Sequence, residues 1–398
     1  MRPLDATVQR LRGILAAVAL LGWPAGALAS PEAPIAGQEA LDYGFRFASS
    51  LNVDPKDKGK AQQAVVTDYI ALGLIDQALA RVEAIEGWYR PAVTADLATA
   101  LARAGRSAEA RALLARIETQ QHVHPGWEGP RVAAHVAQAH AALGDVAPSE
   151  RIASDLAEND PRQYTGRAAA ILSDAHGSRG EYDLALAALR PLEGDTDIEV
   201  AWWRTVGYLE LSRKGALDVA QRRSALDAAR RSAEGLPGWK QAEVLQDIAA
   251  RYRELGQRDG AREALALAER QLEALPPTDE GQPVARANLA RAWAEAGNAE
   301  RARRLLAGAE TAVPKALDLD RPALYAKLAS SWLVVGDERE ARRLYDQALA
   351  AVESLENARP RALAVVEVCR SLGRSRVLLE PGTRARLDGL LGGLKDPW

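Results

Sequence analysis

Apolar side chains recur along most of this chain at the three- and four-residue spacing of amphipathic α-helices, and a glycine follows each apolar stretch. These glycines are Gly73, Gly105, Gly144, Gly180, Gly215, Gly256, Gly297, Gly336 and Gly373. The interval between neighbours ranges from 32 residues, between Gly73 and Gly105, to 41 residues, between Gly215 and Gly256. Such a period indicates an array of small repeated units.

Aligning the glycines brings side chains of similar size into the same columns. Four residues before the glycine the column is mostly bulky: Tyr69, Leu101, His140, His176, Leu211, Tyr252, Trp293, Trp332 and Cys369. Five residues after it the column is mostly small: Ala78, Ala110, Ser149, Ala185, Ala220, Ala261, Ala302, Ala341 and Leu378. A glycine can end a helix in the left-handed conformation of a C-terminal cap, and small residues let a second helix approach the first. The chain is therefore predicted to be all-α, with about nine helical hairpins.

These columns resemble the tetratricopeptide repeat (TPR). Residues 287–297 (ANLARAWAEAG) and 336–341 (GDEREA) are especially similar to that motif. The resemblance covers roughly residues 58–395, with a period longer than the standard 34 residues, as in long-linker bacterial variants. The proline that often closes a repeat is clear only at Pro161 and Pro314. The resemblance implies a right-handed α-solenoid in which the first helix of each hairpin lines a concave groove.

The first 29 residues have a different pattern. Three arginines precede an apolar run over residues 13–21, and the segment ends in Ala27-Leu28-Ala29, which suits signal peptidase. We therefore predict an exported protein, periplasmic or secreted, with cleavage after Ala29. The alternative is a retained membrane anchor, but Trp23-Pro24 interrupts the apolar run short of the roughly 20 residues that a bilayer span requires.

The predicted division of the chain is a signal peptide over residues 1–29, a linker and N-terminal capping helix over 30–57, and the solenoid with a C-terminal cap over 58–398. The capping helix is expected over Glu39–Leu51, where Leu41, Phe45 and Ala48 fall on one face and would cover the apolar flank of the first hairpin.

Two hairpins are expected to be irregular. In the fifth, residues 216–224 are more polar than their counterparts, so the second helix is expected to start near Ser224. In the last, Leu378 breaks the small column and Pro381-Gly382 interrupts the second helix, so this hairpin is expected to act as the C-terminal cap.

Composition narrows the class of partner. The 398 residues include 26% charged residues and carry a formal net charge of -3, without the basic excess that nucleic-acid binding requires. We expect no nucleic-acid partner and no stable membrane insertion after cleavage. Cys369 is the only cysteine, so no intramolecular disulfide can form.

All five histidines fall between His122 and His176. His135 and His140 are five residues apart and so point about 140° apart on a helix, while His140 and His176 occupy the bulky column. We interpret His140 and His176 as packing residues. A loop metal site that uses His122 and His124 is the alternative.

No hydrolase elbow, zinc-protease helix, phosphate-binding glycine loop or metal-binding cysteine pattern is present. We therefore expect no enzymatic activity, no cofactor and no metal.

The aromatic residues offer a further recognition feature. Gly87-Trp88, Gly126-Trp127 and Gly238-Trp239 each stand 17 residues before a capping glycine, which indicates a shared structural role as linker staples. The alternative is an exposed aromatic ridge that meets a partner. Of the adjacent pair Trp202-Trp203, only one can face a helical core, and Trp202 is expected to be the exposed member.

The groove implied by the TPR resemblance should be lined by positions 13, 10, 6 and 3 residues before each glycine. The predicted partner-binding residues are Arg131, Gln138, Arg167, Asp174, Trp202, Gln246, Arg253, Arg291, Glu367 and Arg370, with Thr205, Glu243 and Ser330 in the same register. Arginines outnumber acidic residues in this set, which favours a peptide with acidic side chains or a free carboxylate terminus. The alternative is that these arginines only solvate the groove or pair with neighbouring acids.

The function expected is that of a non-catalytic periplasmic or secreted scaffold that binds a peptide or protein surface in its concave groove. The alternative is a helical accessory subunit of a cell-envelope enzyme or secretion assembly. That alternative predicts an apolar patch on an outer face, larger than a monomer normally exposes.

Overall fold

A computed structural model describes residues 35–51, 54–119, 126, 128–275 and 282–394. Over these ranges the chain is all-α, as predicted, and contains no strand. No helix in this part of the chain is long and apolar enough to cross a bilayer. The predicted signal peptide and its cleavage site lie outside the described residues.

The helices pair into antiparallel hairpins after an initial helix, α2 (Gln38–Ser49). The hairpins are α3 (Pro55–Ala71) with α4 (Ile75–Val82), α5 (Tyr89–Arg103) with α6 (Ser107–Glu118), α7 (Glu128–Leu143) with α8 (Val146–Asn159), α9 (Pro161–Ser178) with α10 (Tyr182–Leu189), α11 (Ile198–Ser212) with α12 (Val219–Ala233), α13 (Gly238–Glu254) with α14 (Arg258–Glu273), α15 (Gln282–Glu295) with α16 (Ala299–Glu310), α17 (Arg321–Val335) with α18 (Glu338–Glu353), and α19 (Ala358–Arg374) with α20 (Pro381–Gly392). The described residues thus form an α-solenoid of nine TPR-like hairpins. The first hairpin begins at Pro55, three residues before the predicted boundary.

Seven of the nine aligned glycines end the first helix of their hairpin in the left-handed conformation, with φ between 73° and 88°. They are Gly73, Gly105, Gly144, Gly180, Gly256, Gly297 and Gly336. The residue after the glycine then bonds back to the bulky column; the amide of Asn298, for example, donates to the carbonyl oxygen of Trp293 at 2.9 Å. Seven of the nine members of the small column are buried directly after the turn, with Ala78, Ala261 and Ala341 completely covered, while Ala220 and Leu378 are exposed.

The fifth hairpin departs from this pattern in a different way from the one predicted. Its second helix starts at Val219 rather than near Ser224, because Asp218 forms a capping box with Gln221. Gly215 does not adopt the left-handed conformation, and α11 ends at Ser212.

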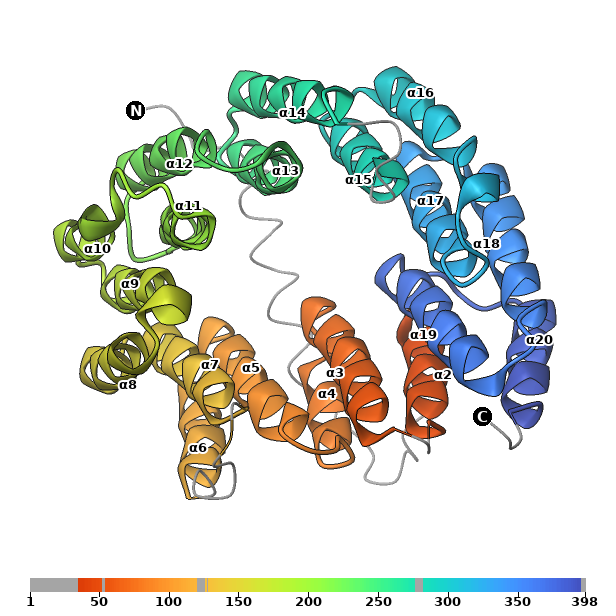
Figure 1. Cartoon of the computed structure of the whole chain (residues 1–398), viewed down its shortest axis with the longest axis horizontal. Coiled ribbons are helices and arrows are strands. Elements are labelled where there is room, and N and C mark those ends of the chain that lie inside the picture. The colour runs from red at the N-terminus through yellow and green to blue at the C-terminus, as the bar shows by residue number, and fades with distance from the viewer. Residues whose placement is uncertain (1–34, 52–53, 120–125, 127, 276–281, 395–398) are drawn as a thin grey trace, which may run out of the picture. The chain divides into compact units, whose positions relative to one another are not determined.

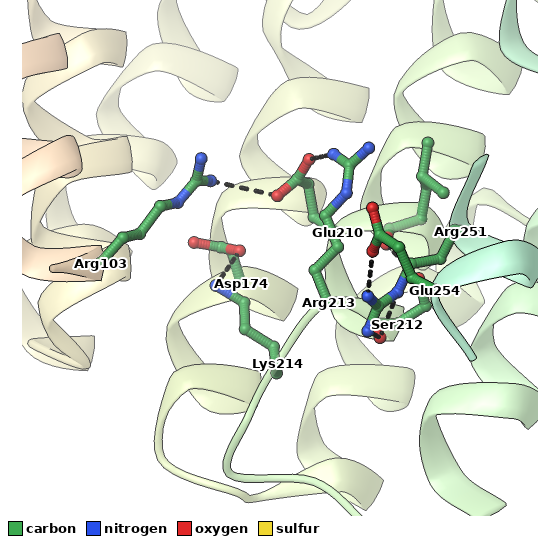
Figure 2. A network of polar contacts seen from close by, with 9 residues as sticks. Arg103, Asp174, Glu210, Ser212, Arg213, Lys214, Arg251 and Glu254 are labelled. Atoms are coloured by element: carbon green, nitrogen blue, oxygen red, sulfur yellow. Dashed lines mark hydrogen bonds and ion pairs between the residues drawn. The ribbon is translucent and has the colours of Figure 1, made fainter. Parts of the chain in front are cut away.

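The end of α11 is capped instead by the next hairpin. Arg251 of α13, whose side chain is 10% exposed, donates from Nε to the carbonyl oxygen of Ser212 at 3.0 Å and contacts the same oxygen through Nη2 (Figure 2). Its Nη1 is paired with Glu254. The guanidinium therefore meets the negative end of the α11 dipole and satisfies a terminal carbonyl that the glycine cap would otherwise have served.

The described residues from Ala36 onward form one compact unit in which the first helix, α2, contacts α19 of the last hairpin. The first helix of each hairpin lies on the inside of a ring and the second on the outside, and α2 fills the place between α3 and α19 (Figure 1). Tyr43 donates to Asp388 of α20 at 2.8 Å, and Arg384 pairs with Glu39 at 2.6 Å. The predicted capping helix exists, but it joins the first hairpin to the last instead of covering a free end.

Glycines make this junction close. A Cβ on Gly373 would lie 2.4 Å from Cδ2 of Leu41, and one on Gly37 would lie 2.3 Å from the carbonyl oxygen of Gly373. Gly373, aligned with the capping glycines, is therefore a packing residue inside α19. Cys369 is completely buried beside Gly44, and burial raises the pKa of its thiol well above the usual range.

Candidate functional site

An inner cavity of about 250 Å3 crosses the first helices of four successive hairpins, α5, α7, α9 and α11. It is lined by Asp96, Thr99, Arg103, Gln138, Ala170, Ile171, Asp174, Trp203, Val206, Gly207 and Glu210. Two of the predicted groove residues, Gln138 and Asp174, are among them. The cavity is a polar strip with both signs of charge and one large aromatic face.

The lining shows which face of each first helix points inward. Asp96, Ile171 and Val206 stand nine residues before their glycines, and Thr99 stands six before, with Gln138 and Asp174 in the same column as Thr99. The predicted column at ten is mostly buried, and Ala95 and Ala134, for example, are completely covered, whereas the column at three is mostly half-buried. The inner face is therefore rotated from the predicted one by less than the 100° step of one residue.

The carboxylates of the cavity are held by cations from neighbouring helices. Glu210 accepts from Arg103 of α5 at 3.1 Å and also pairs with Arg213 (Figure 2). Asp174 pairs with Lys214 at 2.5 Å, and both of these side chains are largely buried (Figure 2). Such pairs fix the side chains in place before a ligand arrives, which lowers the entropy lost on binding.

Two further groups order the opposite end of the cavity. His135 Nδ1 lies 2.7 Å from Asp96. Arg167 donates to the amide oxygen of Gln138 at 3.0 Å, and its guanidinium carbon lies 5.2 Å from the centre of the Trp203 ring. Burial lowers the pKa of Arg167 from its ordinary value. Arg167 thus supports two lining residues rather than standing free in the groove.

Trp203, not Trp202, is the member of the pair that lines the cavity. Its Nε1 donates to Glu199 at 2.9 Å, which orients the ring. Trp202 packs against the main hydrophobic core, and Lys240 Nζ lies 5.1 Å from its ring centre. The prediction chose the wrong side because the inner face is rotated.

The other predicted groove residues are distributed over different contacts. Arg131 lines a second cavity, of about 690 Å3, between α7, α8 and α9. Gln246 donates to the carbonyl oxygen of Ala242 in its own helix. Arg253 and Arg291 both pair with Glu295, at 2.9 and 3.0 Å.

Near the ring junction, Glu367 pairs with Arg370, which also bonds to the largely buried Asp68 of α3 at 2.6 Å. Of the two readings of the arginines, pairing with neighbouring acids holds for Arg253, Arg291 and Arg370. Thr205 and Ser330, in the same register, are buried; Thr205 donates to the hydroxyl of Ser232 at 2.9 Å.

The described histidines each face a carboxylate. Besides His135, His140 Nε2 lies 3.1 Å from Glu118, and His176 Nδ1 lies 2.7 Å from Glu181. In the described part of the chain no group of three or more histidine, cysteine or acidic side chains is arranged to hold a metal ion. His122 and His124 lie outside the described residues.

The Gly-Trp pairs do not share one environment. Trp88 stacks on Tyr89 and packs against the main core, as a staple would. Trp239 is 52% exposed, with Lys240 Nζ 5.6 Å from its ring centre. Trp127 lies outside the described residues. The shared register therefore gives a staple at one position and an exposed ring at another.

No protein-family model and no curated protein sequence matches this chain. Among solved structures, it is similar to Ton1535 from Thermococcus onnurineus NA1, with 14% identity, 83% of this chain and 94% of that chain covered, and a TM-score of 0.32. It is also similar to a chain of the APC/C hetero-tetramer Cut9–Hcn1, with 13% identity, 80% and 57% covered and a TM-score of 0.29. A human IFIT1 dimer with m7Gppp-AAAA matches with 17% identity, 80% and 74% covered and a TM-score of 0.26. With TM-scores this low, nothing that these proteins bind is transferred to this chain.

Proposed function

We propose that this protein is a non-catalytic scaffold that binds an extended peptide or protein segment along the inner face of its ring. The observation that carries the proposal is the inner cavity, because four repeats each contribute side chains to one continuous polar strip. Successive repeats that present an extended concave surface are suited to a chain-like ligand.

The chemistry of the lining fits a polypeptide. The Gln138 amide nitrogen can donate to a peptide carbonyl, and the oxygen of the Thr99 hydroxyl, whose proton goes to the carbonyl oxygen of Ala95, can accept from a peptide amide. Trp203 offers a large apolar face, and Arg103 and Glu210 provide charges of both signs. The volume of about 250 Å3 is below the roughly 300–1,000 Å3 of small-molecule pockets, so it suits a few side chains of a longer ligand.

The N-terminal sequence supports a location of this protein outside the cytoplasm. Its basic start, short apolar run and Ala-Leu-Ala ending are those of an export signal. On this proposal the partner is a periplasmic or secreted polypeptide.

Removing the aromatic face of the cavity should weaken peptide binding about tenfold or more, since buried tryptophans are the usual anchors of such interfaces. The test selects peptides from a random displayed library on residues 30–398 and measures their affinities by calorimetry. The Trp203→Ala variant should bind the selected peptides at least tenfold more weakly. The Trp239→Ala variant, which removes an exposed indole elsewhere in the solenoid, should change the affinity less than twofold. Selected peptides that bind Trp203→Ala as tightly as the wild type, or an empty selection, would contradict the proposal.

A second candidate, a subunit of a larger envelope assembly, is favoured by one observation. Large apolar side chains are exposed at or before the N-terminal ends of four successive inner helices: Ile198 on α11, Trp239 on α13, Val284 on α15, and Leu317 and Leu319 before α17. These inner helices run in the same direction, so their N-terminal ends follow one rim of the ring. An apolar rim of this kind is suited to a protein neighbour.

If that rim is an assembly interface, the Leu317→Ser/Leu319→Ser variant should leave the complex in a native envelope extract. We expect wild-type protein to migrate in size-exclusion chromatography well above its own mass and the double variant to migrate alone. Trp203→Ala, on the inner face, is the control and should stay in the complex. Migration of the wild type as a single chain would exclude this candidate.

A further inference from the structure

We propose that the inner wall formed by α15, α17 and α19 holds a binding site for an oxyanion, centred on Lys327. The inference rests on the proposed function and deepens it. It states which part of the inner face would bind a negatively charged group of the ligand.

The position of Lys327 follows from the repeat. It stands nine residues before Gly336, in the column that Asp96, Ile171 and Val206 occupy at the inner cavity. Its helix, α17, packs on α15 and on α19, so one inner helix flanks it on each side (Figure 1). Lys327 is therefore a half-buried lysine on the inner wall.

Three cations on the two flanking helices lie near this ammonium group. They are Arg291 of α15 and Arg370 and Arg374 of α19. Among the residues that the structure describes, no carboxylate forms an ion pair with Lys327, although the neighbouring arginines have such partners. Glu295 holds Arg291 at 3.0 Å, and Asp68 of α3 bonds to Arg370 at 2.6 Å and lies 3.6 Å from Arg374.

This arrangement is unfavourable for the empty protein. Burial, followed by the three arginines, lowers the pKa of Lys327 to about 8. The ammonium is therefore still mostly charged at pH 7, while the fold disfavours that charge. Folding alone gains nothing from a lysine here, since a methionine would pack the same aliphatic stem without the charge. A half-buried charge without a partner is typical of functional sites.

The ligand class follows from the donors. Lysine contributes a compact charge with three donors, and arginine presents a planar fork that matches carboxylate and phosphate oxygens. The side chains of Arg291 and Arg374 are 40% and 39% exposed, so their donor groups can be reached from the interior of the ring. A carboxylate of the bound polypeptide or a phosphate group fits these donors equally, and the experiment separates the two.

The test measures binding of acetyl-tetraglutamate amide, of its tetraglutamine counterpart and of inorganic phosphate to residues 30–398, by calorimetry at low ionic strength and pH 7. The wild type should bind tetraglutamate, and Lys327→Met should weaken that binding at least tenfold. Lys60→Met, at an exposed lysine of α3, is the matched control and should change it less than twofold. Phosphate binding that also requires Lys327 would support the site and identify a phosphate group as the oxyanion that it binds.

A lower affinity of the Lys327→Met variant would not be due to unfolding. The substitution removes an unfavourable charge, so the melting temperature of the variant should equal or exceed that of the wild type. Equal tetraglutamate and phosphate affinities in wild type and Lys327→Met, or no binding of either anion by the wild type, would overturn the inference. Binding of tetraglutamine as tight as that of tetraglutamate would also overturn it. Library peptides that need Trp203 but not Lys327 would leave the proposed function in place without this site. A tetraglutamate site that needs Lys327, with an empty library selection, would leave the site without the proposed function.

Discussion

Replacing Gly373 by valine should detach α2 from α19 and lower the free energy of unfolding by about 3 kcal/mol. The reason is steric, because even the first carbon of a side chain would lie 2.4 Å from Cδ2 and 2.5 Å from Cγ of Leu41, which is completely buried. To relieve this overlap, α2 must shift, and Phe47 and Ala48 lose part of their burial with it. Urea unfolding followed by circular dichroism measures the loss.

The matched control is the same substitution at Gly389 of α20, where an added Cβ meets nothing within 4 Å. Valine is a better helix former than glycine, so Gly389→Val should stay within about 0.5 kcal/mol of the wild type. Hydrogen exchange locates the effect: in Gly373→Val the amides of α2 should exchange faster while those of α9, far around the ring, keep their protection. Wild-type protection of α2 in Gly373→Val would show that the junction tolerates the side chain.

The closed ring was not predictable from the repeat pattern. The columns show that each hairpin packs on the next, and this determines an α-solenoid but not how far each hairpin rotates relative to its neighbour. That rotation decides whether the two ends meet. The sequence did contain a signal of this close packing. Gly37, Gly44 and Gly373 all lie at the junction, and turns do not account for all three glycines.

The local pattern was more informative than its register. Seven of the nine capping glycines and most of the bulky and small columns were correct, because each depends on contacts within one hairpin. The inward-facing register differs in part from the predicted one, because a rotation of less than one residue step changes which positions face inward, so Trp203 lines the cavity in place of Trp202. The partner of Arg370 could not be foreseen, because Asp68 comes from the other end of the chain, whereas Arg291 pairs with Glu295 four residues further along its own helix.

Replacing Arg370 by methionine should lower the free energy of unfolding at pH 7 by about 3 kcal/mol, because it leaves a buried carboxylate without its main partner. Asp68 is 5% exposed in its side chain, and its bond to Arg370 Nε at 2.6 Å joins α3 to α19 across the ring junction. The next cation, Arg374, lies 3.6 Å away. Arg304→Met, which removes an exposed ion pair with Glu300, is the control and should cost less than about 1 kcal/mol.

The deficit of Arg370→Met should depend on pH in a definite direction. Burial raises the pKa of Asp68 in the folded protein above its ordinary value, and loss of Arg370 raises it further. Between the unfolded and folded pKa values the folded state then binds more protons than the unfolded state, so stability falls as pH rises through that window. The deficit should therefore be smaller at pH 4 than at pH 7, because the raised pKa keeps more of the buried carboxyl protonated at the lower pH. Asp68→Asn combined with Arg370→Met removes the unpaired charge and should recover most of the loss at pH 7. An equal deficit at both pH values, or no recovery in the double variant, would show that the buried charge of Asp68 is not its cause.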